Sequence, residues 1–218
     1  MKATTTVLAA ALFAGPLQAA ETEKHDTPIE ELDTDTVLRS GLTHAIERRK
    51  RIPWHEKRGE VVHWEVCRKS PGGCAVHIEA IVDYIVDASE AHEVDPYVLA
   101  SIVWTESRYQ PYATGKAGEM GIVQIHPSNR HGLQWMRKGR EGERYRKTCR
   151  KQVGQCQHEV AQHGAGILSR YAARCGSIEG GLAAYNTGRC DSTAGAKYAT
   201  RVLRLAGDLR HEVEGGSA

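Results

Sequence analysis

The chain has 218 residues, of which 40% are hydrophobic, and its 29 basic and 27 acidic residues leave a formal net charge of +2. This length fits one globular domain with a sizeable core. Beyond the N-terminus no stretch is apolar for long enough to span a bilayer, which excludes stable membrane insertion, and the lack of a recognised nucleic-acid motif argues against a nucleic-acid partner.

The N-terminus has the layout of a secretory signal peptide. Lys2 precedes an apolar run over residues 7–14, and small residues stand at Ala19 and Ala20. We therefore predict a signal peptide over residues 1–20 and a periplasmic or secreted, monomeric mature protein. The first cysteine is Cys67, so an acylated N-terminal cysteine is not expected.

Six cysteines in an exported chain favour disulfides over metal thiolates. They are Cys67, Cys74, Cys149, Cys156, Cys175 and Cys190. Fifteen pairings are possible, but the equal spacing within the first two and within the next two suggests two local loops. That leaves Cys175 with Cys190.

Residues 21–60 are polar and charged, which predicts a leader or linker with one short helix near residues 37–49. The catalytic domain is predicted over residues 61–213. Its first helix is indicated by apolar residues at helical spacing: Val76, Ile78, Ile81, Val82, Ile85 and Val86.

Asp95 and Pro96 predict the start of the next helix, because aspartate caps free amides and proline fits the first turn. This helix should end before Pro111. Gly115, Gly118 and Gly121 then indicate a loop, and residues 121–125 could form a short strand. Further helical patterns over residues 160–174, 178–185 and 198–209 complete a mainly α fold.

Glu106 is the unusual residue of the second predicted helix. It lies one turn after Ile102 and Val103, on a face that is otherwise apolar. Burial raises the pKa of a carboxyl group, and a protonated glutamate can donate a proton to a leaving oxygen. On this helix alone, a glutamate that simply reaches water is the simpler interpretation.

Three motifs and a closing helix favour the catalytic interpretation of Glu106 instead. They are DPYVLASIVWTESRY at 95–109, GEMGIVQIHP at 118–127, AYNTG at 184–188 and YATRVL at 198–203. In this order they resemble the soluble lytic transglycosylase (SLT) family, over roughly residues 78–205. The resemblance implies a two-lobed, helical, goose-type lysozyme-like domain with a catalytic cleft and no cofactor.

The resemblance also implies roles for individual residues. Glu106 would be the catalytic acid and base, and Tyr198 would support its carboxyl group. Substrate would be contacted by residues of the three motifs: Ser107, Met120, Gly121, Gln124, Tyr185 and Asn186. The implied reaction cleaves the glycosidic bond between N-acetylmuramic acid and N-acetylglucosamine in peptidoglycan and closes a 1,6-anhydro ring without water.

Glu119 departs from the family pattern, which more often has a small or neutral residue there. As a second carboxylate it could position water, which would make the enzyme a hydrolytic muramidase. A noncatalytic wall-binding protein and a chitin-cleaving relative are further alternatives.

A basic stretch at residues 137–151 holds eight lysines or arginines and two glutamates. It is a solvated surface or a binding surface for an anionic cell-wall polymer. No metal site is expected, because His158, Glu159 and His163 lack the H-E-x-x-H spacing. A G-x-S-x-G element of serine hydrolases is also missing.

Overall fold

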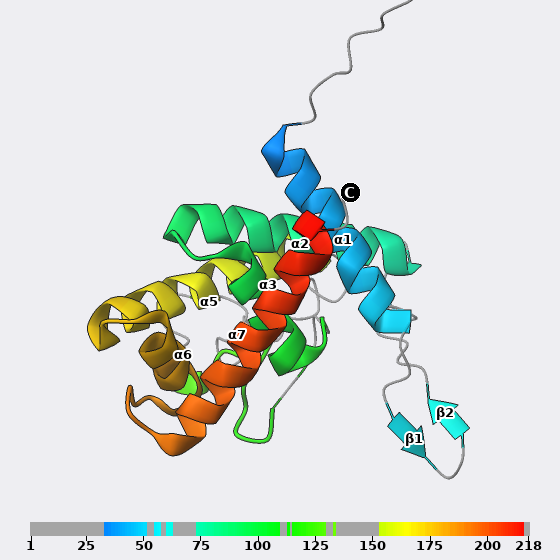
Figure 1. The fold of residues 1–218 in the computed structure, drawn as a ribbon. Helices are drawn as coiled ribbons and strands as arrows, with labels where there is room; N and C mark the ends of the chain where they lie inside the picture. Colours follow the sequence, from blue (N-terminus) through cyan, green and yellow to red (C-terminus); the bar gives the residue numbers. More distant parts are fainter. Residues whose placement is uncertain are drawn as a thin grey trace, which may run out of the picture. The chain divides into compact units, whose positions relative to one another are not determined.

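Helices make up almost all of the described structure, which confirms the predicted mainly α fold (Figure 1). The computed structural model describes residues 33–51, 55–57, 60–62, 73–109, 113, 115–129, 133 and 153–215. Its helices are α1 (Thr34–Arg51), α2 (Gly73–His92), α3 (Pro96–Ser107), α5 (Val153–Cys175), α6 (Ile178–Thr187), α7 (Thr193–Glu214) and the 3-10 helix η1 (Pro127–Asn129). An antiparallel hairpin, β1 (His55–Lys57) and β2 (Glu60–Val62), pairs His55 with Val62.

Several predictions concern residues outside this description. They include the signal peptide at 1–20, the basic stretch at 137–151, Cys67, Cys149 and the side chain of Cys74. Cys156 is disulfide-bonded. Among the described residues, no helix is both long and apolar enough to cross a membrane.

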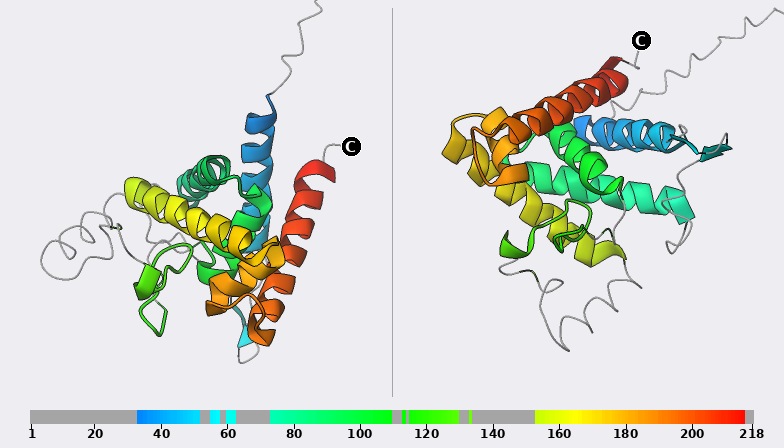
Figure 2. Two further views of the ribbon diagram at one scale, coloured as in Figure 1. Left: turned by 90° about the vertical axis from the view of Figure 1, so that its left-hand side faces the viewer. Right: turned by 90° about the horizontal axis from the view of Figure 1, so that it is seen from below.

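The central helix is α3, and other helices surround it. It packs against α2 and α7, while α5 packs between α2 and α6 (Figures 1 and 2). Its buried side chains lie on all sides of the helix, including Leu99, Ile102 and Val103, each 0% exposed. A helix that is apolar all round is stable only in such surroundings.

The short helix predicted near residues 37–49 is present within the longer α1, but α1 is part of the packed domain rather than of a leader or linker. It packs against α2 and α7, and its Leu42, Ala45 and Ile46 belong to the core. Only these few apolar residues lie on one face of an otherwise charged helix, so the sequence pattern is weak. The folded domain therefore begins before residue 61, at α1.

The start of α3 follows the predicted capping chemistry. The Asp95 carboxylate accepts hydrogen bonds from the backbone amides of Tyr97 at 2.8 Å and Val98 at 3.4 Å, and Pro96 occupies the first turn. The same carboxylate pairs with Arg210 of α7. Asp95 therefore fixes both the beginning of α3 and its contact with α7.

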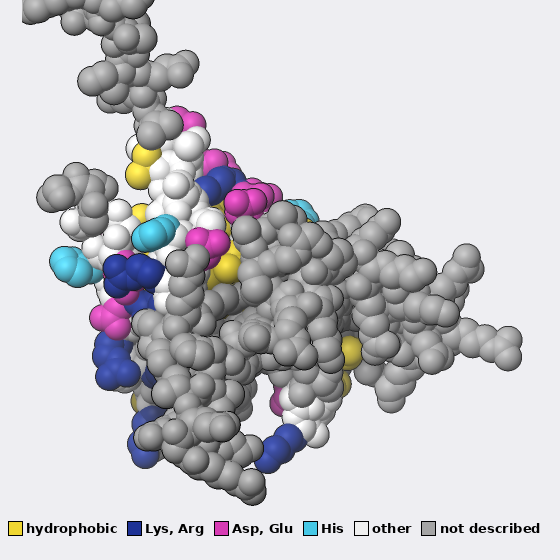
Figure 3. Space-filling view, turned by 90° about the vertical axis from the view of Figure 1, so that its right-hand side faces the viewer, with side chains coloured by type: hydrophobic (Ala, Val, Ile, Leu, Met, Phe, Trp, Pro, Cys, Tyr) yellow, Lys and Arg dark blue, Asp and Glu magenta, His cyan; other side chains and the backbone are white. Residues whose placement is uncertain are grey.

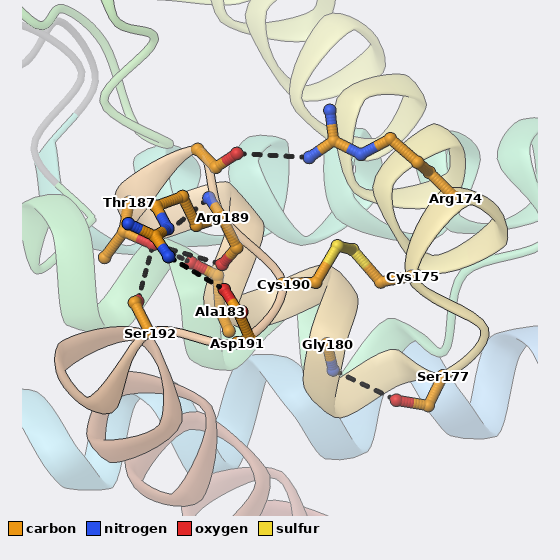
Figure 4. The surroundings of a disulfide bond; sticks show 11 residues. Arg174, Cys175, Ser177, Gly180, Ala183, Thr187, Arg189, Cys190, Asp191 and Ser192 are labelled. Atoms are coloured by element: carbon orange, nitrogen blue, oxygen red, sulfur yellow. Dashed lines mark hydrogen bonds and ion pairs between the residues drawn. A yellow bond between two sulfur atoms is a disulfide. The ribbon is translucent and has the colours of Figure 1, made fainter.

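Close packing and one disulfide hold α5, α6 and α7 together. A Cβ atom on Gly181 of α6 would come within 2.7 Å of the Ala172 backbone of α5, so only glycine permits this approach. Cys175, the last residue of α5, forms the predicted disulfide with Cys190 in the loop between α6 and α7 (Figure 4). Ser177 and Ser192 cap α6 and α7 by accepting backbone hydrogen bonds.

Two substitutions separate the contribution of the Asp95 helix cap to stability from that of its ion pair with Arg210. Asp95→Ala removes both and should lower the free energy of unfolding by about 1–2 kcal/mol. Asp95→Asn keeps a side-chain acceptor for the cap and should cost less. Urea unfolding followed by circular dichroism measures both variants, and equal stability of Asp95→Ala and wild type would contradict this account.

Candidate active site

Glu106 lies in the last turn of α3, with its carboxyl group half-buried. The helix ends directly after it, because Arg108 adopts a left-handed conformation with φ of 55° and its backbone amide bonds to the Trp104 carbonyl. The Tyr198 hydroxyl of α7 donates a hydrogen bond to Glu106 Oε1 at 2.6 Å. Two helices far apart in sequence thus meet at this carboxyl group.

The surroundings raise the pKa of Glu106 above its ordinary value. Burial is the largest cause, and the negative charge of Glu119 acts in the same direction. The Tyr198 hydrogen bond and the charges of Arg201 and Arg108 oppose this rise, because they favour the carboxylate. Burial thus favours the protonated form of this carboxyl group, while Tyr198, Arg201 and Arg108 favour its ionised form.

Tyr198 is itself held in place. It is 2% exposed, and burial followed by the charge of Glu106 raises its pKa well above its ordinary value. The Tyr198 hydroxyl therefore stays a hydrogen-bond donor to Glu106. The Arg201 guanidinium, one turn further along α7, lies 5.9 Å from the centre of the Tyr198 ring.

The glycine loop forms the wall opposite α3. Gly118 and Gly121 have φ of 91° and 85°, a backbone region that side chains disfavour. An isolated bridge between Met120 and Ile125 closes a turn over the intervening residues, so the suggested short strand at 121–125 is instead a turn.

Gln124 supports this turn from within. Its side-chain amide donates to the carbonyls of Ala113 and Gly121, both at 2.9 Å. The side-chain amide nitrogen is thus committed to the loop backbone. Gln157 of α5 fixes the loop further, because its side-chain oxygen accepts from the Ile122 amide at 3.2 Å.

Glu119 is tied into the same loop. Its carboxylate accepts a hydrogen bond from the Ala117 amide at 3.0 Å. A Cβ atom on Gly115 would come within 2.1 Å of Glu119 Oε2, so glycine at 115 makes room for this side chain. The second carboxylate is therefore oriented by the loop rather than by Glu106.

The end of α6 supplies the third wall. The Tyr185 hydroxyl donates to the Val123 carbonyl at 2.8 Å, which joins α6 to the loop. Gly164 of α5 lets this contact form, since a Cβ atom there would lie 2.6 Å from the Val123 side chain. Asn186 follows with an exposed side chain.

These walls enclose a cavity of about 350 Å³. The residues that line it come from α3, the glycine loop, η1, α5 and the end of α6: Glu106, Glu119, Gln124, His126, Ser128, Asn129, Tyr171, Ala184, Tyr185, Asn186, Thr187 and Gly188. The Cys175–Cys190 disulfide lies close in sequence to Gly188, and Arg174 donates to the Gly188 carbonyl (Figure 4).

The cavity does not include every residue proposed from the sequence. Ser107 is only 5% exposed, and its hydroxyl donates to the Val103 carbonyl within α3. Met120 packs against the core, and Gly121 contributes its backbone to the turn. Of the substrate-contact set, the residues that line the cavity are thus Gln124, Tyr185 and Asn186.

Other residues of the site were not predicted. Tyr171 of α5 lines the cavity, and the Arg174 guanidinium lies 4.5 Å from the centre of its ring. His126, Ser128 and Asn129 add polar groups; His126 lies within the second motif, and Ser128 and Asn129 directly follow it. Tyr171 has no motif around it, whereas the position of His126 within the second motif, two residues after Gln124, was a usable signal.

The described residues contain no group of three or more histidine, cysteine, aspartate or glutamate side chains arranged to hold a metal ion. What the arrangement offers is one partly desolvated carboxyl group, a phenol that donates to it, a second carboxylate and several amides and hydroxyls. Such a set can transfer protons to and from a polar substrate.

One comparison with known proteins agrees with this chemistry. The family model described as Transglycosylase SLT domain matches residues 83–202, more than half of the chain. The match begins in α2 and ends in α7, so it covers Glu106, the glycine loop and Tyr198. No curated protein matches the chain significantly.

The raised pKa of Glu106 predicts a pH-dependent stability difference. A glutamate with a raised pKa in the folded state stabilises the fold fully below its ordinary pKa of about 4.5, and that contribution is lost as the pH rises through the raised value. Glu106→Gln keeps the size and the acceptor for Tyr198 but never ionises. Its stability relative to wild type should therefore increase as the pH rises.

Thermal unfolding of both proteins between pH 4 and 8 measures this difference. Glu79→Gln, the same substitution at an exposed position of α2, is the control for a nonspecific effect of charge removal. Parallel pH profiles of Glu106→Gln and wild type would show that the Glu106 carboxyl is not desolvated.

Proposed function

Because the chain belongs to the transglycosylase SLT family, we propose that it cleaves the β-1,4 bond between N-acetylmuramic acid and N-acetylglucosamine in peptidoglycan and leaves a 1,6-anhydromuramyl end. Family membership supports a transglycosylase acting on peptidoglycan in general. The observation that carries the finer proposal is the half-buried Glu106 carboxyl group at the cavity, bonded to Tyr198.

In the first step, protonated Glu106 donates its proton to the glycosidic oxygen. The bond between that oxygen and the muramyl C1 breaks, and the N-acetylglucosamine leaves with a free hydroxyl. The raised pKa of Glu106 supports this role, because it keeps the acid protonated closer to neutral pH. The muramyl acetamide stabilises the positive charge that develops on C1.

In the second step, the Glu106 carboxylate removes the proton from the muramyl C6 hydroxyl. The C6 oxygen then bonds to C1 and closes the anhydro ring, while Glu106 regains its proton. Tyr198 and the charge of Arg201 favour the carboxylate that exists between the two steps. No water enters the balance, and one carboxyl group serves both steps.

The cavity walls suit an N-acetylated sugar. The exposed Asn186 side chain can bond to an acetamide or hydroxyl group, and the Tyr171 ring offers an aromatic surface for a sugar face. We do not assign Gln124 a direct contact with the substrate, because its side-chain amide nitrogen bonds to the loop backbone. We assign it to shaping the glycine loop against the substrate.

Hydrolysis is the second candidate, and Glu119 is the observation that favours it. Its carboxylate lines the same cavity as Glu106 and could position water on the muramyl C1. Its hydrogen bond to the Ala117 amide opposes this role, since that bond orients the carboxylate toward the loop. We therefore favour ring closure.

We place the enzyme outside the cytoplasm, in the periplasm or secreted. The N-terminal pattern of residues 1–20 supports export. The Cys175–Cys190 disulfide and the disulfide-bonded Cys156 support an oxidising compartment. The substrate proposed for the cavity is also found there.

The masses of soluble muropeptides test the reaction. Digestion of purified peptidoglycan by the wild-type protein should release products lighter by one water than hydrolysis products. Glu106→Gln should slow release about 100- to 10,000-fold, because one side chain supplies both acid and base. Full-mass products that disappear in Glu119→Gln would instead establish the muramidase.

The Tyr198 hydroxyl should set the pH range of activity. Tyr198→Phe removes a hydrogen bond that lowers the pKa of Glu106, so the alkaline limb of the kcat profile should move to higher pH. The maximal rate should also fall by about tenfold, since the carboxyl group loses an orienting partner. Tyr84→Phe, which removes a hydroxyl from α2, is the matched control. An unshifted limb in Tyr198→Phe would contradict the role of this bond.

A further inference from the structure

A row of basic side chains runs along α7 beside Glu106. Lys197, Arg201 and Arg204 are all exposed, and their spacing of four and three residues places them on one face of the helix. With a rise of 1.5 Å per residue the row is about 10 Å long. Figure 3 shows lysine and arginine side chains following one another down its left edge, where α7 lies.

This row lacks the acidic partners that other arginines of the fold have. Arg39 bonds to three aspartates, Arg49 to Glu212 and Arg210 to Asp95. Within the described parts of the chain, neither Lys197, Arg201 nor Arg204 makes an ion pair. Asp208 lies one turn after Arg204 on the same helix, but the two side chains form no ion pair. No ion pair with a described residue neutralises the charge of this row, although the charge of Arg201 acts on the Glu106 carboxyl group.

The row reaches the active site at Arg201. Its guanidinium lies over the Tyr198 ring, and the Tyr198 hydroxyl bonds to Glu106. Arg108, two residues beyond Glu106, brings a further guanidinium, which lies 5.0 Å from the centre of the Trp104 ring. Burial and then the charge of Arg201 lower the pKa of Arg108, as expected for neighbouring cations.

The charged groups that line the cavity are opposite in sign to those of the α7 row. The cavity is lined by two carboxyl groups, Glu106 and Glu119, and by no lysine or arginine. An anionic substituent is disfavoured in the cavity and favoured over α7. When Glu106 is protonated for catalysis, it no longer neutralises Arg201, and attraction of an anion to this surface increases.

We propose that Arg108 and the α7 row of Lys197, Arg201 and Arg204 form a cationic surface that binds carboxylates carried by muramyl residues of the glycan strand. This inference rests on the proposed function, which supplies a substrate with such groups. The carboxylate belongs either to the lactyl group of a muramyl residue without a peptide or to the peptide stem. Both sources present the same anion to the guanidinium groups.

Binding to the Glu106→Gln protein tests the proposal without turnover. The uncharged glutamine stands in for the protonated acid and removes any effect of Arg201 on the pKa of Glu106. Calorimetry would compare three ligands: a neutral oligomer of N-acetylglucosamine, glycan strands stripped of peptides, and strands that carry stems. The variants are Arg201→Gln with Arg204→Gln, and Arg48→Gln of α1 as a control with an exposed arginine elsewhere.

We expect the double substitution to weaken binding of a carboxylate-bearing ligand about fivefold to tenfold, with less effect at high salt, and to leave the neutral oligomer unchanged. If binding weakens only for stem-bearing strands, the surface binds the peptide carboxylates. If binding of the stripped strands weakens, the surface binds the lactyl group. Equal weakening of all three ligands, an equal effect of Arg48→Gln, or no change at all would overturn the proposal. Charge-dependent binding by a wild-type protein that releases no muropeptides would contradict the proposed reaction but retain this surface.

Discussion

A carboxyl group held partly away from water at the last turn of α3 is the constraint on which the site depends. A structural role does not explain Glu106 at this position, because burial disfavours the charged form of its carboxyl group. The surrounding structure compensates with one short hydrogen bond from Tyr198 and with cations nearby. Burial therefore favours the protonated form of this carboxyl group, while Tyr198 and the nearby cations favour its ionised form.

The rest of the domain positions this group. Asp95 fixes the start of α3, and the left-handed Arg108 ends it one turn after Trp104, so Glu106 stands where the helix opens to the cavity. The buried Tyr198 requires α7 to lie against α3, and Asp95 and Arg210 join the two helices at the other end. Tyr185 and Gln157 then hold the glycine loop against α5 and α6.

Local chemistry made much of the fold predictable. Asp95 and Pro96 mark the beginning of α3, and the apolar spacing of α2 identifies its buried face. The boundary of the domain was not predictable in the same way, because α1 buries only a few residues of a charged helix. Glu106 could be singled out as a carboxylate among apolar neighbours, but its pairing with Tyr198 joins residues 92 positions apart and was accessible only through the family resemblance.

Residue order alone also misplaced some side chains. Ser107 follows Glu106, yet successive residues of a helix point about 100° apart, so when Glu106 faces the cavity Ser107 faces the core. The cavity lining by Tyr171 arises from the packing of α5 against its neighbouring helices, which no short motif encodes. The sequence therefore identifies the acid and its loop, while helix packing determines which side chains surround them.

The central claim is that Glu106 serves as both acid and base in a reaction that consumes no water. Digestion of peptidoglycan in water enriched in oxygen-18, followed by mass spectrometry of the released muramyl ends, tests it most directly. Ring closure predicts anhydromuramyl products that contain no oxygen-18. One oxygen-18 atom at the muramyl C1 of products released by the wild-type protein would show that water attacks this carbon and would contradict the account.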